Sequence, residues 1–179
     1  LQTLSGTATI VRQYVDKVAG TGAKIVDTRK TLPGLRTAQK YAVLCGGGYN
    51  HRIGLYDGIL IKENHITAAG GIAQAIANAR ALNAGVALMT EAETLQEAQA
   101  ALAADVDLLL VDDFKLPELR EAVTLTRAHR AHGGKTAIEY SGGTTLENVR
   151  AIAECGVDRI SIGGITKHLH AVDMSMRFV

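Results

Sequence analysis

Apolar residues follow two spacings along the chain, and their alternation predicts helices and strands in turn. From Ser5 to Ala19 they recur every three or four positions, which predicts a helix with Ser5 as its N-cap. Continuous apolar runs predict buried strands at 23–27, 59–62, 86–92, 107–111, 135–140 and 159–162. Further helical patterns lie at 36–45, 71–82, 94–104, 145–154 and from the turn around Pro117 to His132. This order predicts a parallel β-sheet covered by helices.

The strand ends decide between two parallel architectures. A dinucleotide-binding sheet would need Gly-x-Gly-x-x-Gly after its first strand, where this chain has Thr28-Arg29-Lys30. Polar or glycine residues instead follow nearly every predicted strand, namely Arg29, Lys62, Glu91, Asp112, Ser141 and Gly163. In a β/α barrel those ends surround one mouth, where active sites form. A complete barrel usually takes ~250 residues, and this chain has 179. We therefore expect an α/β fold, an incomplete TIM-like parallel β/α barrel of about six strands, with residues 1–179 as one domain.

Composition excludes several classes of function. With 19 Lys and Arg against 18 Asp and Glu, the formal charge is +1, which gives no support for binding nucleic acid or a membrane surface. No apolar run reaches the ~18 residues of a membrane span, and the first residues do not resemble a signal peptide. Two cysteines are too few for a disulfide framework, so we expect a cytoplasmic protein.

Basic residues collect in the first third of the chain, at Arg29, Lys30, Arg36, Lys40, His51, Arg52 and Lys62. Three of them, Arg29, Lys30 and Lys62, follow predicted strands and should meet at the barrel mouth. Converging cations in a partly closed site suit a ligand with several carboxylates or phosphates. A solvated basic face is the alternative interpretation, but surface charge has no reason to follow strand ends.

Two carboxylates and two glycine turns complete the candidate site. Glu91 and Asp112 end consecutive predicted strands, where they could hold a hydrated Mg²⁺ or form structural ion pairs. The turns Ser141-Gly142-Gly143 and Ile162-Gly163-Gly164 follow the last two strands, where barrels often bind phosphate. By contrast, His129 and His132 are expected to cap or solvate a helix end, and the spacing of His168 and His170 does not suit two metal ligands on one helical face.

Several segments carry a family resemblance along the whole chain. Residues 27–36, 40–48, 50–52 and 61–65, with the opening 1–6 and the ending 166–178, resemble quinolinate phosphoribosyltransferase. The resemblance implies transfer of phosphoribosyl from 5-phosphoribosyl 1-pyrophosphate to quinolinate with Mg²⁺. The products would be nicotinate mononucleotide, CO₂ and pyrophosphate, a step in NAD biosynthesis.

The resemblance also implies roles at matching positions. Thr28, Arg29, Lys30, His51, Arg52 and Lys62 would bind quinolinate and neighbouring phosphate charge. Glu91 and Asp112 would lie near the ribose hydroxyls and near the Mg²⁺, in direct contact or through water, and 141–143 and 162–164 would hold the 5-phosphate. As catalytic residues we expect Lys30, Lys62, Glu91 and Asp112: the carboxylates stabilise positive charge at the ribose carbon, and a lysine handles a proton.

The chain departs from the family pattern in three places. Met89 stands where an acidic residue is usual, and Asp113 stands where an asparagine is common. An N-terminal α/β domain of roughly a hundred residues, a common domain size, is absent from this chain. In the family that domain closes the partner subunit's barrel and donates an arginine to quinolinate, which implies a homodimer or larger homo-oligomer.

Two alternative functions stay open at this point. One is a related transferase with another acceptor, such as a molybdenum-associated homologue, although His51 and Arg52 argue against it. The other is a folded half that binds a phosphorylated ligand and is inactive without the missing domain.

Overall fold

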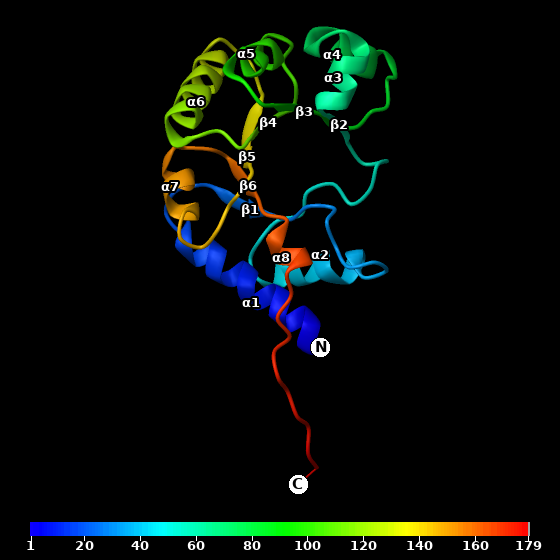
Figure 1. Ribbon diagram of the computed structural model, residues 1–179, viewed down its shortest axis with the longest axis vertical. Helices are drawn as coiled ribbons and strands as arrows, with labels where there is room; N and C mark the ends of the chain where they lie inside the picture. The colour runs from blue at the N-terminus through cyan, green and yellow to red at the C-terminus, as the bar shows by residue number, and fades with distance from the viewer. Residues whose placement is uncertain (179) are drawn as a thin grey trace.

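Six parallel strands form one sheet in the computed structural model, which describes residues 1–178. The strands are β1 (Lys24–Val26), β2 (Ile59–Ile61), β3 (Leu88–Ala92), β4 (Leu108–Asp112), β5 (Ala137–Ser141) and β6 (Arg159–Ser161). The helices are α1 (Gln2–Lys17), α2 (Arg36–Cys45), α3 (Glu63–Ala69), α4 (Ile72–Ala81), α5 (Leu95–Ala103), α6 (Leu116–Ala131), α7 (Val149–Glu154) and α8 (Gly164–Lys167). The spatial order of the strands is β1-β6-β5-β4-β3-β2, and Figure 1 shows the helices arranged around the outside of this sheet.

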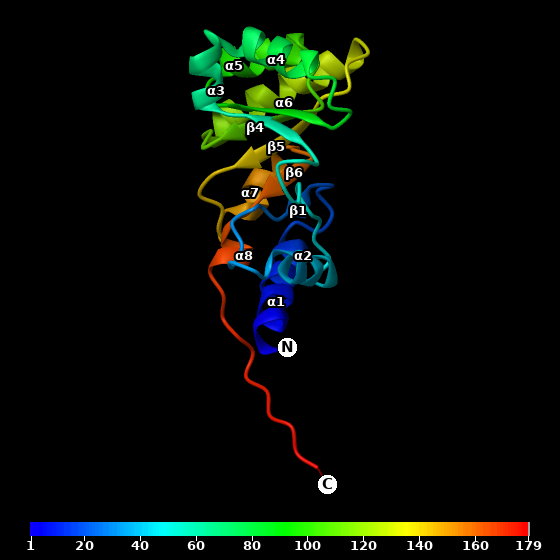
Figure 2. The same ribbon diagram turned by 90° about the vertical axis from the view of Figure 1, so that its right-hand side faces the viewer.

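The sheet is an incomplete barrel, as the sequence predicted. Strands β1 and β2, which follow one another in the chain, form the two edges of the sheet. Beside β1, the Tyr49 N–H donates to the carbonyl of Ile25 at 2.8 Å, and the Asp27 N–H donates to the carbonyl of Tyr49 at 3.1 Å. The segment at Tyr49 therefore extends the sheet by one residue into the gap. After α8 the chain leaves the body as an extended segment (Figure 2).

Each strand presents one face to the helices and the other to the barrel interior. Ile25, Leu109, Ile138 and Ile160 are buried in the apolar core that the helices cover. The alternate positions point inward because side chains switch faces at every residue of a strand. The parallel register places Glu91 on β3 beside Leu110 on β4, and Leu110 beside Glu139 on β5. Charged groups therefore lie inside the barrel while its outer face stays apolar.

Most element boundaries lie within a few residues of the predicted ones, and α2 matches its prediction at both ends. Thr94 caps α5, since its hydroxyl accepts from the Glu97 N–H at 3.2 Å. The predicted N-cap at Ser5 is wrong, because α1 already begins at Gln2. The short helices α3 and α8 were not predicted. Helix α3 buries none of its residues, so it leaves no apolar stripe in the sequence. No helix within residues 1–178 combines the length and apolar character that crossing a membrane requires.

The glycines that follow α2 allow α1 to lie close to the sheet. A Cβ added at Gly46 would come within 2.5 Å of the Ala8 carbonyl oxygen and 2.7 Å of the Val11 Cβ. Gly46 itself has an ordinary helical backbone, with φ −75° and ψ −5°. The requirement for glycine at this position is therefore steric.

We expect Gly46→Ala to lower the free energy of unfolding by about 1–3 kcal/mol, because the added methyl group forces α1 outward. Urea unfolding of the protein would measure this change. Cys45→Ala changes the neighbouring exposed residue and should stay within about 0.5 kcal/mol of the wild type. Equal stability of the two variants would contradict the steric explanation.

Candidate active site

Two adjoining pockets open at the carboxyl ends of the strands. The first, of about 160 Å³, brings together Arg29, Lys30, His51, Arg52, Lys62 and Glu91, and we call it the cationic pocket. The second, of about 440 Å³, is lined by Asp112, the turn 141–145 and the turn 162–164, and we call it the glycine-loop pocket. Thr28, Lys30, Ser141 and Ser161 line both. Every candidate site residue from the sequence thus lines one of two neighbouring pockets, and the roles of these residues stay predictions.

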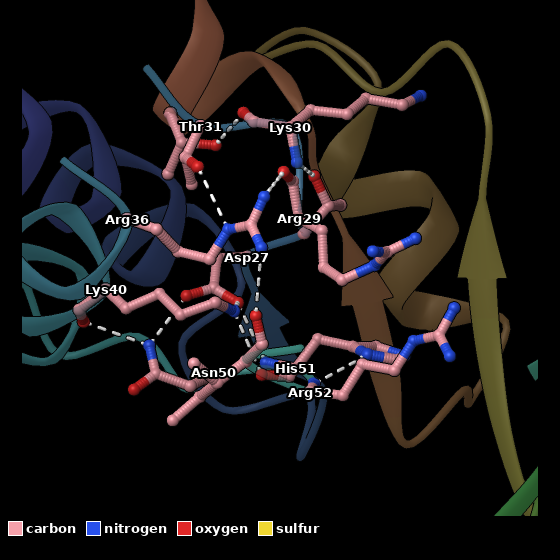
Figure 3. A network of polar contacts seen from close by, with 12 residues as sticks. Asp27, Arg29, Lys30, Thr31, Arg36, Lys40, Asn50, His51 and Arg52 are labelled. Atoms are coloured by element: carbon pink, nitrogen blue, oxygen red, sulfur yellow. Dashed lines mark hydrogen bonds and ion pairs between the residues drawn. The ribbon is translucent and has the colours of Figure 1, made fainter. Parts of the chain in front are cut away.

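A buried ion pair holds the segment that carries His51 and Arg52. Lys40 Nζ lies 2.5 Å from Asp27 Oδ1, and both side chains are almost fully buried. Asp27 also accepts from the His51 N–H at 2.8 Å and from Asn50 Nδ2 at 2.6 Å, and Lys40 Nζ donates to the His51 carbonyl at 2.9 Å. Burial raises the pKa of the Asp27 carboxyl, while the hydrogen bond and charge of Lys40 oppose that shift. This network fixes the main chain of His51 from both sides (Figure 3).

Two residues of α2 hold the loop that follows β1. Arg36 donates to the carbonyl of Arg29 at 3.1 Å and to the Thr31 hydroxyl at 3.2 Å. Gln39, which is fully buried, accepts from the Leu32 N–H at 2.7 Å through its side-chain oxygen. These contacts support the loop from behind, so the side chains of Arg29 and Lys30 are free to extend away from α2 (Figure 3). Arg36 and Lys40, which the sequence grouped with the other basic residues, therefore hold the loops and line neither pocket.

The cationic pocket concentrates positive charge in a partly buried space. Burial and the neighbouring Arg29 charge lower the pKa of the Arg52 guanidinium. Arg52 is held by a hydrogen bond of 2.8 Å from its guanidinium to the Gly58 carbonyl. Such crowding of cations is costly unless an anion compensates it, so the pocket favours an anionic ligand.

Glu91 and Lys62 form an ion pair on one side of this pocket. Lys62 Nζ lies 2.5 Å from Glu91 Oε2, with the lysine half-exposed and the glutamate buried. Burial raises the pKa of the Glu91 carboxyl; Lys62 opposes the shift and Asp112 adds to it. Met89, two residues before Glu91, is buried. Its side chain packs against Gly58, where an added Cβ would lie only 2.6 Å from Met89 Cε. At Met89 the barrel interior below Glu91 is therefore filled by an apolar side chain.

The two carboxylates that the sequence paired for Mg²⁺ lie in different pockets. Asp112 lines the glycine-loop pocket, and within residues 1–178 it forms no salt bridge. Glu91 instead has oxygen atoms within 4.8 Å of those of Glu63 and Glu93. One Glu91 oxygen is already paired with Lys62, so a cation at Glu91 would compete with this lysine, whereas Asp112 has no such competitor within residues 1–178.

The glycine-loop pocket depends on two residues with left-handed backbone. Gly142 has φ +113°, and a Cβ there would lie 2.1 Å from Asp113 Oδ1. Asp113 has φ +54°, a conformation that aspartate and asparagine tolerate better than most residues. The Asp113 N–H donates to the Ser141 carbonyl at 2.9 Å, which ties the ends of β4 and β5 together. An asparagine at this position would suit the same backbone.

Sequence reasoning missed several pocket residues, of which Glu139, Ser161 and Lys167 are the most informative. Glu139 stands two residues before Ser141 and Ser161 two before Gly163, so the two-residue period of a strand could have found them. Lys167 and His168 lie one turn beyond the second glycine turn, at the end of the unpredicted α8. His129 lines neither pocket, and its Nε2 lies 2.8 Å from Asp105 Oδ1.

Comparisons with known proteins identify the family. Residues 7–177 match the family described as "Quinolinate phosphoribosyl transferase, C-terminal domain". The chain belongs to the quinolinate phosphoribosyltransferase family. A probable nicotinate-nucleotide pyrophosphorylase [carboxylating] of Bacillus subtilis is 44% identical over 177 residues, covering 98% of this chain and 59% of the relative. The Mycobacterium leprae enzyme of that name is 41% identical over 97% of this chain and 60% of its own length.

Solved structures of the family have the same fold. The nicotinate-nucleotide pyrophosphorylase from Francisella tularensis is 47% identical, with a TM-score of 0.92 over 98% of this chain and 60% of that one. A nicotinate-nucleotide pyrophosphorylase from Pyrococcus furiosus, at 17% identity and a TM-score of 0.71, shares the fold alone. The chain therefore spans about 60% of the length of the curated relatives named above.

We expect Lys40→Met to lower the free energy of unfolding by about 3–5 kcal/mol, because it leaves the Asp27 carboxylate buried without its partner. The double variant Asp27→Asn with Lys40→Met should lose less free energy of unfolding than the two single variants lose in sum. Urea unfolding of all four proteins gives the coupling energy. Additive losses would show that the pair does not act as a unit.

Proposed function

We propose that this chain is the barrel domain of a quinolinate phosphoribosyltransferase acting in NAD biosynthesis. In the full-length enzyme it would join quinolinate to 5-phosphoribosyl 1-pyrophosphate and release nicotinate mononucleotide, CO₂ and pyrophosphate. One observation carries the proposal: a pocket rich in cations adjoins a pocket lined by glycine turns, and Lys30 and Ser141 line both. A dicarboxylate and a phosphorylated sugar could then bind side by side.

Quinolinate has two adjacent carboxylates on one aromatic ring, so it needs several fixed cations. Arg29 and Arg52 offer planar guanidinium groups, which bind carboxylates through paired hydrogen bonds. Lys62 could bind the ligand while it stays paired with Glu91. The apolar side chains of Leu60 and Leu110 line the same pocket and would contact the ring.

The first chemical step forms one bond and breaks another at the ribose carbon. The ring nitrogen of quinolinate attacks that carbon, and the bond to pyrophosphate breaks with its electron pair leaving on oxygen. Positive charge develops on the ribose in the transition state, and Glu91 and Asp112 would stabilise it as fixed anions. Mg²⁺, when bound, would neutralise the pyrophosphate, and Asp112 would hold it through water.

Loss of CO₂ breaks the bond between the ring and one carboxylate. The electron pair stays on the ring carbon beside the cationic nitrogen, and that carbon then takes up one proton. Lys30 and Lys62 are our candidates for supplying it. The 5-phosphate would meanwhile lie against the N–H groups of the turns 141–143 and 162–164, where glycine permits close approach.

We propose further that the complete site needs a second subunit. The part of its relatives that this chain does not match would include the N-terminal domain, which in the family closes the partner's barrel. A homodimer or larger homo-oligomer in the cytoplasm fits this arrangement. Both cysteines within the described residues are unpaired, as a reducing compartment would leave them.

Binding and turnover measured together test the function. Calorimetry with 5-phosphoribosyl 1-pyrophosphate, Mg²⁺ and quinolinate should detect binding to the full-length enzyme, and a product assay should detect nicotinate mononucleotide. Binding by this chain without product would indicate an inactive half. Binding of 5-phosphoribosyl 1-pyrophosphate but not quinolinate would indicate another acceptor, and binding of neither would contradict the assigned site.

We expect Lys62→Ala and Glu91→Ala each to lower kcat/KM roughly 100- to 1,000-fold, or about 3–4 kcal/mol, since each removes a fixed charge from the reacting groups. Steady-state kinetics in the full-length enzyme would measure the loss. Lys135→Ala, at an exposed lysine before β5, and His129→Ala are controls and should stay within a few-fold of the wild type. Near-normal activity of both site variants would mean that the roles are misassigned.

A further inference from the structure

Glu139 is a buried carboxyl group without a hydrogen bond. It projects from β5 into the barrel, lines the base of the cationic pocket and is 0% exposed. Neither of its carboxyl oxygens has a hydrogen-bond partner within residues 1–178. The Ser161 hydroxyl lies close enough to Glu139 to lower the pKa of that carboxyl, but its hydrogen bond in this structure goes to the carbonyl of Tyr140 at 3.3 Å. A buried polar group without a partner is unusual and calls for a functional explanation.

The imidazole of His51 lies next to Glu139. His51 Nε2 lies 3.6 Å from Glu139 Oε1, slightly beyond hydrogen-bond distance, and it too is buried without a partner. The other ring nitrogen, Nδ1, accepts from the Arg52 N–H at 2.8 Å, so it carries no proton. Burial, followed by the charges of Arg52 and Lys40, lowers the pKa of His51 to about 4. At neutral pH His51 is therefore uncharged, with its proton on Nε2 and directed to Glu139.

Groups from several elements surround Glu139. Strand β6 brings Arg159 and the Ser161 hydroxyl, the end of β1 brings Asp27, β4 brings the apolar Leu110, and the segment after Tyr49 brings His51. Burial raises the pKa of Glu139 to about 7, against the opposing effects of Ser161 and Arg159. The carboxyl group is consequently divided between its charged and neutral forms at physiological pH.

We propose that Glu139 is a proton-binding positioning residue, which takes up one proton from solution when an aromatic dicarboxylate binds in the cationic pocket above it. The inference rests on the proposed function for the identity of that ligand. Bound negative charge disfavours a second anion close by, so the ligand shifts Glu139 to its neutral form. The protonated carboxyl then leaves the His51 Nε2–H and the surrounding cations to the ligand.

Proton uptake by Glu139 makes the affinity for quinolinate depend on pH in one direction. Below about pH 6 Glu139 is neutral with or without ligand, so binding takes up no proton there. Above about pH 7 it is charged in the free protein and neutral in the complex. In this range quinolinate affinity falls by up to about tenfold per pH unit, because each binding event takes up one proton.

Calorimetry of quinolinate binding to the full-length enzyme tests the proposal, with titrations at pH 8 in buffers of different ionisation enthalpy. We expect uptake of close to one proton by the wild type and by Glu139→Asp, which keeps an ionisable carboxyl group. Glu139→Gln should take up none and should bind equally well at pH 7 and pH 8.5. Phthalate, a dicarboxylate without the ring nitrogen, should give the same pattern and excludes protonation of the ligand ring.

The outcomes separate the inference from the function on which it rests. A wild type that binds quinolinate without proton uptake overturns the inference, and so does equal uptake by Glu139→Gln. A wild type that binds no quinolinate contradicts the proposed function. Infrared titration of the ligand-free wild type then tests the premise of the inference, which fails unless the spectrum shows a protonated carboxyl band that disappears near pH 7 and is absent from Glu139→Gln. Should that variant not fold, the band must shift in Glu139→Asp, which keeps a carboxyl group at this position on a shorter side chain.

Discussion

The ion pair between Asp27 and Lys40 is the interaction on which the rest of the site depends. It joins the end of β1 to α2 inside the protein, at a distance of 2.5 Å between Lys40 Nζ and Asp27 Oδ1. Both partners also bind the main chain of His51, one through its N–H and the other through its carbonyl. A buried pair of this kind contributes little net stability, but it becomes very costly when one partner is misplaced. The pair therefore selects one position for the segment that crosses the gap between β1 and β2, and with it the position of Arg52.

The open barrel explains why this segment needs such support. A closed barrel would hold the region between β1 and β2 by a continuous ladder of main-chain hydrogen bonds. Here a single bridge at Tyr49 replaces a strand, and side chains supply the remaining contacts. Arg36 and Gln39 act in the same way on the loop after β1. Arg29, Lys30, His51 and Arg52 are thus carried by loops that one helix, α2, holds through polar contacts, whereas Lys62 lies between β2 and α3.

The sequence allowed the sheet, most helices and the location of the site to be predicted, since these depend on local patterns. Strand ends gather at one mouth in any parallel barrel, so Arg29, Lys62 and Asp112 could be placed together from their order alone. The sequence did not reveal which basic residues line the pockets. Lys40 and Arg36 differ from Lys30 and Arg29 only in their long-range partners, and those partners depend on how α2 lies against β1. Glu139 was overlooked for a different reason: its strand was taken as a continuous apolar run, although the two-residue period places it on the same face as Ser141.

The overall charge of +1 conceals how the site is balanced. Cations at the mouth attract an anionic ligand, yet the barrel interior beneath them contains carboxyl groups as well, and a carboxylate there would oppose the ligand. The negative charge of Glu91 is compensated by its ion pair with Lys62. Glu139 has no such partner, and burial brings its pKa to about 7, where losing its charge costs little. A glutamine would remove the conflict at every pH, whereas a glutamate makes the strength of the cationic pocket depend on protons. The same residue that leaves the free protein with an unsatisfied group thereby lets the pocket adjust its charge to that of its ligand.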